Sequence, residues 1–344
     1  MVKKKKTLWQ VVFLLLLIVG TVLIIRQQRT MPYQHNEGFV FGTVYHITYQ
    51  SKKDLRPEIV AEMQKVDDAL STFNKQSVIS KVNRNEAVQL NDMFTDVFTL
   101  AQTISQETHG AFDITVAPLV NEWGFGFKQG VEPTRHVVDS LRALVGYEKV
   151  KLSKGRIVKA DPRIMLDCSA IAKGYGVDVV ARYLRSQGIH NFMVEIGGEV
   201  VTSGINEQRM PWKIGVTKPT DDSTQTNREL QTVLNVTDKA MATSGNYRNF
   251  YYKDGKKYAH TVDPKTGYPV QHNILSATVI ANHCAVADAY ATSFMVMGLE
   301  GAKKILGKHP ELMAYLIYAD EKGNNQVWFS GISEEDGSAE AEAG

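Results

Sequence analysis

The chain has 344 residues, of which 43% are hydrophobic and 22% are charged, a composition that suits a large folded core and excludes a largely disordered chain. The formal net charge is +2, but residues 1–29 hold six Lys or Arg and no acid, and the remainder has 33 basic and 37 acidic residues. The folded part is therefore mildly acidic, and its composition predicts no nucleic-acid partner.

The N-terminus has the pattern of a membrane anchor. Lys3 to Lys6 precede an apolar run from Leu8 to Ile25, and Arg26 and Arg29 follow it. As a helix, this run would cover about 27 Å, close to the thickness of a bilayer core. No small-residue cleavage site follows, which favours an uncleaved signal anchor over a cleaved signal peptide or a buried helix. The charge bias predicts a single-pass protein of the inner (cytoplasmic) membrane whose folded domain faces the periplasm or exterior.

The anchor divides the chain into four predicted segments. These are the cytoplasmic tail and anchor (1–29), a linker (30–38), one folded domain (39–331) and an acidic disordered tail (332–344). Cys168 and Cys284 lack the spacing of a structural zinc site. A disulfide between them and two buried thiols both remain open.

Hydrophobic periodicity predicts an α+β domain. Strands are predicted at 39–50, 164–166, 192–196, 213–216, 233–236 and 277–280, and helices at 57–71, 91–108, 173–186, 287–297 and 299–306. Asp254-Gly255 predicts the turn of a further hairpin. Because the strands come in groups and do not alternate regularly with helices, we expect mixed, largely antiparallel sheets with packed helices.

The predicted helix at 287–297 carries the first candidate site. Asp288 and Thr292 are four residues apart and share one helix face among small alanines. A carboxylate in such an apolar helix is costly unless it is paired or bound to a metal, and oxygen ligands suit Mg²⁺. The alternative is that Asp288 is a helix N-terminal charge and that Thr292 bonds to a backbone carbonyl.

A second candidate lies at residues 166–184. A predicted strand ends at Asp167, small residues follow, and Lys173-Gly174 opens a helix. A helix N-terminus after a small-residue loop can bind an anion, and Lys173 could balance phosphate charge. The alternative is an ordinary helix start with a solvated lysine. The glycines of a Walker A loop are absent.

Three further stretches have open interpretations. In residues 110–126, Phe112, Trp123 and Phe125 either flank a planar ring or belong to the core, and Asp113 stands isolated among apolar residues. Gly197-Gly198 permits a bulge or a close backbone approach. Residues 243–245 are either an anion contact or a simple turn between strands.

The stretch YAHTVDPKTGYP, residues 258–269, is a shaped turn. Asp-Pro and Thr-Gly are turn signals, and Asp263 is expected to cap the turn. A turn by itself needs no histidine, so His260 calls for another explanation.

These stretches, together with two upstream, resemble the ApbE family of FAD:protein FMN transferases. The matching motifs, which occur in the family's order, are GTVYHITY (42–49), STFNKQSVISKVN (71–83), GAFDITVAPLVNEWGFG (110–126), DCSAIAKGYGVD (167–178), VEIGGEV (194–200), ATSGNYR (242–248), HTVDPKTGYP (260–269) and ADAYAT (287–292). The resemblance covers about residues 39–300.

The resemblance implies an enzyme that binds FAD, uses Mg²⁺ to cleave its diphosphate, releases AMP and joins FMN to a protein Thr or Ser through a phosphoester. Family acceptors are subunits of sodium-pumping NADH:quinone reductases and related membrane electron-transfer complexes. These acceptors carry a Ser/Thr-Gly-Ala-Ser/Thr-like motif. The folded domain at 39–331 would then be the catalytic domain.

The resemblance also implies roles for individual residues. Asp288 and Thr292 match metal ligands, with main-chain oxygens near Ala170 and Ala291. His260 and Asp288 are alternative general bases. The positions that match flavin contacts are Phe41, Phe73, Ala111, Phe112, Asp113, Asp167, Lys173 and Val262. Phe41, Glu199 and Asn246 depart from the residues that many members have, which are methionine at the first position and aspartate at the other two.

Two rival functions remain. With water as the acceptor, the same site would make an FAD pyrophosphatase that releases FMN and AMP. A non-catalytic, membrane-tethered flavin-binding protein is the second rival. The combination of Asp288, Thr292, Lys173 and His260 argues against it, because binding alone needs no metal pair.

Overall fold

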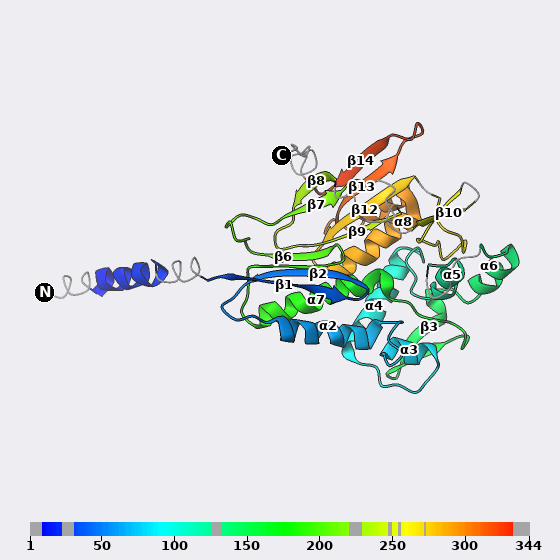
Figure 1. Ribbon diagram of the computed structural model, residues 1–344, viewed down its shortest axis with the longest axis horizontal. Coiled ribbons are helices and arrows are strands. Elements are labelled where there is room, and N and C mark those ends of the chain that lie inside the picture. Colours follow the sequence, from blue (N-terminus) through cyan, green and yellow to red (C-terminus); the bar gives the residue numbers. More distant parts are fainter. Residues whose placement is uncertain are drawn as a thin grey trace.

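An eight-stranded sheet organises the computed structural model, which describes residues 9–22, 31–125, 132–219, 229–246, 250–253, 256–271 and 273–332 (Figure 1). The strand order is β1-β2-β5-β6-β9-β12-β13-β14, and all neighbouring strands are antiparallel. The strands are β1 (Tyr33–Val40), β2 (Thr43–Gln50), β5 (Phe192–Ile196), β6 (Glu199–Ser203), β9 (Ala240–Gly245), β12 (Ile274–Ala281), β13 (Met313–Ala319) and β14 (Asn325–Ser330).

Three two-stranded sheets accompany the large one. They are β3 (Val150–Ser153) with β4 (Arg156–Lys159), β7 (Lys213–Thr217) with β8 (Leu230–Asn235), and β10 (Phe250–Lys253) with β11 (Lys256–Ala259). The last pair confirms the predicted hairpin, although its turn at Asp254-Gly255 lies outside the described residues.

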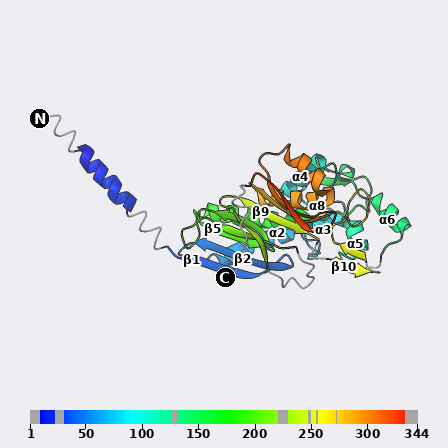
Figure 2. The ribbon, with the colours of Figure 1, turned by 90° about the horizontal axis from the view of Figure 1, so that it is seen from above.

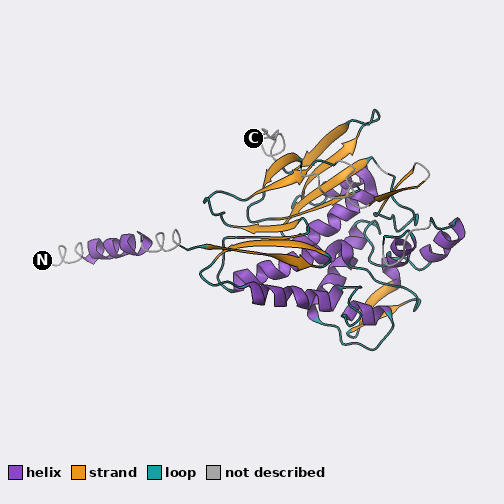
Figure 3. Cartoon of the chain, in the orientation of Figure 1, coloured by secondary structure: helices purple, strands orange, loops and turns teal. Residues whose placement is uncertain are grey.

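Helices cover one face of the large sheet, as Figure 3 shows. The helices of the folded domain, of which α7 and α8 lie directly against the strands of the large sheet, are α2 (Arg56–Leu70), α3 (Val78–Asn83), α4 (Asp92–Glu107), α5 (Ala117–Glu122), α6 (Arg135–Arg142), α7 (Ser169–Ser186) and α8 (Cys284–Leu306), with the 3₁₀ turn η1 (Tyr147–Lys149). Side chains of β12 alternate between two cores: Val279 packs with α8, whereas Ile280 packs with Leu234 of β8. The mixed α+β fold with a large antiparallel sheet is therefore confirmed.

Helices α7 and α8 lie in close contact, because their interface contains a glycine and a buried carboxylate. A Cβ on Gly174 would come 2.4 Å from the main-chain oxygen of Cys284, so only glycine fits there. Asp178 of α7 accepts hydrogen bonds of 2.9 Å from the N–H groups of Cys284 and Ala285. A negative charge thus caps the N-terminus of α8 from the neighbouring helix. Cys168 and Cys284 are both buried free thiols.

The N-terminal apolar segment is helical over residues 9–22 and lies apart from the sheet and its helices (Figures 1 and 2). Its large apolar side chains are exposed, Trp9 by 75%. Within the described ranges, no helix is both long enough and apolar enough to cross a membrane. Both ends of the predicted run from Leu8 to Ile25, and the predicted acidic tail from residue 333 onward, lie outside the described residues.

The predicted strand at 39–50 is two strands joined by a tight turn. Phe41 and Gly42 have φ values of 51° and 75°, and Val40 pairs with Thr43. This is the positive-φ pair that a two-residue hairpin requires. β1 begins at Tyr33, inside the predicted linker. Its polar residues hid the strand signal, and the strand owes its existence to pairing with β2.

One predicted strand and one predicted helix start were wrong. Residues 164–166 form no strand. The backbone of Leu166 is hydrogen-bonded by the Asn83 side chain instead of by a neighbouring strand: the Asn83 amide donates to the Leu166 carbonyl (2.8 Å) and accepts from the Leu166 N–H (2.7 Å). α7 begins at Ser169, whose N–H donates to Asp167 Oδ1 at 2.7 Å. Lys173 is therefore one turn inside the helix and does not open it.

Candidate active site

A cavity of about 660 Å³ opens where the β1–β2 turn, the β5–β6 turn and helices α7 and α8 meet. Its lining includes every predicted site residue except Ala291, whose side chain is fully buried. The predicted residues that line it are Phe41, Phe73, Ala111, Phe112, Asp113, Asp167, Ala170, Lys173, His260, Val262, Asp288 and Thr292. Segments spread over most of the chain therefore converge on one cavity.

Asp288 lies in the second turn of α8 and is only 5% exposed. Its Oδ2 accepts a hydrogen bond of 3.1 Å from the backbone N–H of Gly174. Burial raises the pKa of the Asp288 carboxyl, while the Lys173 ammonium and the Gly174 amide oppose that shift. Because Asp288 is beyond the first turn, it is not a helix N-terminal charge. Thr292 lines the cavity one turn further along.

Lys173 and Glu199 form an ion pair at the cavity wall. Glu199 is 2% exposed, and its Oε2 has no hydrogen-bond partner among the described residues. Burial raises the pKa of Glu199 to about 7, with Asp288 adding to the rise and Lys173 opposing it. Burial alone would lower the pKa of Lys173, but the two carboxylates outweigh it and the pKa is raised. One ammonium thus faces two buried carboxylates.

Sequence reasoning missed Glu199 as a site residue. The available signal was a carboxylate directly after Gly197-Gly198 in an otherwise apolar strand. Those glycines form the β5–β6 turn, with φ values of 63° and 100°. A Cβ on Gly197 would lie 2.7 Å from Thr43 Cγ2, so this turn packs tightly against the β1–β2 turn. The predicted close backbone approach is confirmed.

His260 lines the cavity beside a hydrogen-bonded turn. Asp263 caps the turn as predicted: its Oδ1 accepts from Lys265 N at 2.9 Å and its carbonyl accepts from Gly267 N at 2.8 Å. The Gly267 carbonyl in turn accepts a 2.8 Å hydrogen bond from Trp123 Nε1. The histidine is therefore carried by a segment that is fixed to Trp123, the residue at the C-terminal end of α5.

The predicted aromatic residues divide between core and cavity. Trp123 and Phe112 are 1% and 2% exposed, so both belong to the core. Phe112 also forms part of the cavity wall. Phe125 lines the cavity and makes a T-shaped contact with the His260 ring, at 6.4 Å between centroids. Phe73 is 75% exposed at the cavity. The Phe41 ring lies over Gly176, where a Cβ would come 2.5 Å from Cε2.

Two of the predicted acidic residues also hold the backbone in place. Both oxygens of Asp113 accept hydrogen bonds from protein groups: Oδ1 from the Thr115 N–H and hydroxyl, and Oδ2 from Tyr147 N at 2.7 Å. Asp167 caps α7 through Ser169. Residues 243–245, predicted as an anion contact or a turn, form the end of β9 and line the cavity.

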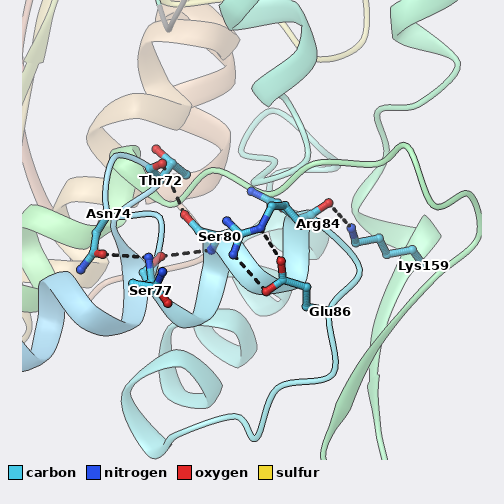
Figure 4. Close-up of polar contacts among 9 residues, drawn as sticks. Thr72, Asn74, Ser77, Ser80, Arg84, Glu86 and Lys159 are labelled. Atoms are coloured by element: carbon cyan, nitrogen blue, oxygen red, sulfur yellow. Dashed lines mark hydrogen bonds and ion pairs between the residues drawn. The ribbon is translucent and has the colours of Figure 1, made fainter.

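One wall of the cavity comes from the loop after α2 and from α3 (Figure 4). Ser80 belongs to this wall: its Oγ donates to the carbonyls of Ser71 and Thr72, and its N–H donates to Ser77 Oγ. Arg84 makes a bidentate ion pair with Glu86. Apart from Phe73, no residue of this wall was predicted to have a role, although residues 71–83 carry one of the matching motifs.

Comparisons with known proteins agree with this architecture. The model of the ApbE family matches residues 41–317. The FAD:protein FMN transferase of Vibrio cholerae is 40% identical over 277 residues, which are 77% of this chain and 82% of the relative. That of Haemophilus influenzae is 37% identical over 303 residues, covering 83% of this chain and 86% of the relative.

Solved structures of flavin transferases have the same fold. The flavin transferase ApbE from Vibrio cholerae superposes with a TM-score of 0.80 at 36% identity, over 88% of this chain and 98% of that one. The apo form of Pseudomonas stutzeri flavinyl transferase ApbE gives 0.79 at 28% identity, over 90% and 98%. With its sequence motifs, its fold and its cavity all in agreement, the chain belongs to the ApbE family.

Proposed function

We propose that the chain is a Mg²⁺-dependent FAD:protein FMN transferase, which cleaves the FAD diphosphate, joins FMN to a Thr or Ser hydroxyl and releases AMP. The observation that carries this proposal is the Asp288–Lys173–Glu199 cluster in the wall of a cavity of about 660 Å³. Cavities of this size hold cofactor-sized ligands. The names of the relatives support the same activity.

The residues present fit a Mg²⁺ ion. Asp288, Thr292 and Glu199 offer hard oxygen atoms at one wall, and Glu199 Oε2 is a buried acceptor without a donor among the described residues. No three His, Cys, Asp or Glu side chains gather into a metal cage within the described ranges. Mg²⁺ commonly uses one or two carboxylates, with water and phosphate oxygens completing its shell. The predicted main-chain ligands near Ala170 and Ala291 would complete the set. When bound, the ion would neutralise diphosphate charge.

The chain's own residues would do the rest of the chemistry by positioning and charge. The Lys173 ammonium would neutralise charge developing on the diphosphate. Phe41 and Phe73 offer aromatic faces for the flavin ring. The His260 ring would accept the proton of the incoming hydroxyl, with Asp288 as the alternative base. The remaining proposed flavin contacts are Ala111, Phe112, Asp113, Asp167 and Val262.

The test is a transfer assay on the full chain in detergent, with FAD, Mg²⁺ and a small acceptor domain that bears the Ser/Thr-Gly-Ala-Ser/Thr-like motif. Intact mass and in-gel flavin fluorescence report the product. We expect one FMN on the acceptor, lost with EDTA and in Asp288→Asn, and kept in Asp139→Asn, an exposed carboxylate on α6. Loss of FAD with an unmodified acceptor would support the pyrophosphatase instead. Intact FAD would leave only flavin binding.

We also propose that residues 8–25 anchor the chain in the inner membrane, with the catalytic domain in the periplasm, where it would meet subunits of membrane electron-transfer complexes. The exposed apolar side chains at 9–22 support this proposal. Membrane fractionation of the full chain and of a chain without residues 1–29 tests it. Recovery of the full chain in the soluble fraction would refute it.

A further inference from the structure

The turn that carries Glu199 into the cavity is held from the opposite face of the sheet by Glu195. β5 ends at Ile196 and β6 begins at Glu199, and these two residues pair across the turn. Successive strand residues point to opposite faces. Ile196 and Glu199 are buried on the helix side, whereas Glu195 lies beside exposed His46 of β2 on the opposite face.

Glu195 uses both of its oxygens there. Its Oε1 accepts a hydrogen bond of 2.9 Å from the Gly198 N–H. Its Oε2 lies 2.6 Å from Nδ1 of His46. The Glu195 side chain is 23% exposed and the His46 side chain 51% exposed, so this contact by itself adds little to stability. Its effect is to orient the carboxylate toward the turn.

The turn depends on such contacts because Gly197 and Gly198 have no side chains to pack and are conformationally free. Three contacts outside the β5–β6 ladder hold it. The Gly197 N–H donates to the Val44 carbonyl at 3.0 Å, the Gly198 N–H donates to Glu195, and the Glu199 carboxylate holds Lys173. Without Glu195, no described side chain holds the Gly198 amide.

We propose that Glu195 is a positioning residue for the reaction. His46 orients the Glu195 carboxylate, which fixes the backbone of Gly198. The position of Gly198 in turn determines where the Glu199 carboxylate holds the Lys173 ammonium. This role rests on the proposed function. The residue touches no substrate and acts through two other residues, so its removal changes the rate while the fold persists. Lys173 would neutralise charge that develops during the transfer, so the effect falls mainly on kcat.

The experiment compares FMN transfer by the full chain with that of Glu195→Ala, Glu195→Gln, His46→Ala and the double variant of Glu195→Ala with His46→Ala. Glu37→Ala is the matched control, because Glu37 pairs with His46 from β1 on the same face but does not contact the turn. Urea midpoints check that each variant is folded.

We expect Glu195→Ala to lower kcat at least tenfold, with the KM for FAD within about threefold of wild type and an unchanged urea midpoint. Glu195→Gln keeps an oxygen that can accept from Gly198, so its kcat stays within about threefold. His46→Ala should lower kcat less than Glu195→Ala does. The double variant should have the same kcat as Glu195→Ala, because two residues that act through one contact have non-additive effects. Glu37→Ala matches wild type.

A Glu195→Ala enzyme with wild-type kcat, or a Glu195→Gln enzyme as slow as Glu195→Ala, would overturn this role while leaving the proposed function intact. An additive double variant would remove His46 from it. A wild-type chain that transfers no FMN would instead refute the proposed function, and this role with it.

Discussion

The backbone N–H of Gly174 in α7 donates a hydrogen bond to Oδ2 of Asp288 in α8, at 3.1 Å. The same glycine allows α7 to approach the first turn of α8, where a Cβ would come 2.4 Å from the Cys284 carbonyl. The distance between the helices and the orientation of the buried carboxylate are therefore set at one position.

Gly174→Ala should destabilise the protein by about 1–3 kcal/mol, because the new methyl group meets backbone that cannot yield without moving a helix. Urea unfolding measures the change. Transfer activity should fall as well, since Asp288 moves with α8. In Gly307→Ala, the Cβ meets its nearest atom at 3.4 Å, so this control should stay within about 0.5 kcal/mol of wild type. A Gly174→Ala protein as stable as the control would contradict the tight helix contact.

Asp178→Asn should lower the free energy of unfolding by roughly 1.5–3 kcal/mol. The NH₂ group of asparagine replaces one of the two carboxylate oxygens, so a donor then faces the backbone N–H of Cys284 or Ala285. The carboxylate is 6% exposed, so water cannot readily substitute. The matched change is Asp139→Asn, whose Arg135 and Arg142 partners lie on an exposed surface at 3.7 and 3.5 Å. It should have little effect. Equal urea midpoints for the two variants would rule out the cap.

Glu199 should make stability fall as pH rises. Burial raises the pKa of its carboxyl to about 7, so between about pH 4.5 and 7 the folded state holds a proton that the unfolded state releases. Above this window, the folded state bears the full cost of a second buried carboxylate beside Asp288. Measured without divalent cations, the stability of Glu199→Gln relative to wild type should therefore increase across this window. A difference that does not change with pH would contradict the raised pKa.

Phe41→Ala should weaken FAD binding about tenfold, the loss expected when one aromatic face is removed from a flavin site. Phe39→Ala is the matched control, because Phe39 lies in the same hairpin but is 73% exposed and does not line the cavity. Quenching of flavin fluorescence on titration gives both dissociation constants. If the two variants bind FAD equally well, Phe41 does not contact the flavin.

The elements with strong periodicity were predictable. The helix predicted at 91–108 is α4, Asp92–Glu107, and the predicted break between 287–297 and 299–306 lies at Gly298, where φ is 73° and ψ is 175°. Segments whose structure depends on partners were not predictable. The polar β1 exists because β2 pairs with it, and β6, β9, β13 and β14 were missed. The family, in contrast, was recognisable from eight short motifs, and that prediction is confirmed.

Many residues of the candidate site were predictable from motifs, but Glu199 and the arrangement of the site were not. Motif matching found many of the residues that line the cavity, because they lie within short continuous motifs of the sequence. It could not show that Asp113 holds the backbone N–H of Tyr147, 34 residues away, or that Glu199 pairs with Lys173, 26 residues away. Both facts arise from contacts between segments far apart in the sequence.

The large sequence separation between α7 and α8 affects how well the protein resists proteolysis. Gly174 and Asp288 are 114 residues apart, and Asp178 and Cys284 are 106 apart. The charge cluster therefore exists only after a very long loop has closed, and a ligand that needs the cluster cannot bind the unfolded chain. At one hundred times its dissociation constant, such a ligand adds about 2.7 kcal/mol to the free energy of unfolding. The supply of substrate would thus also govern resistance to proteolysis.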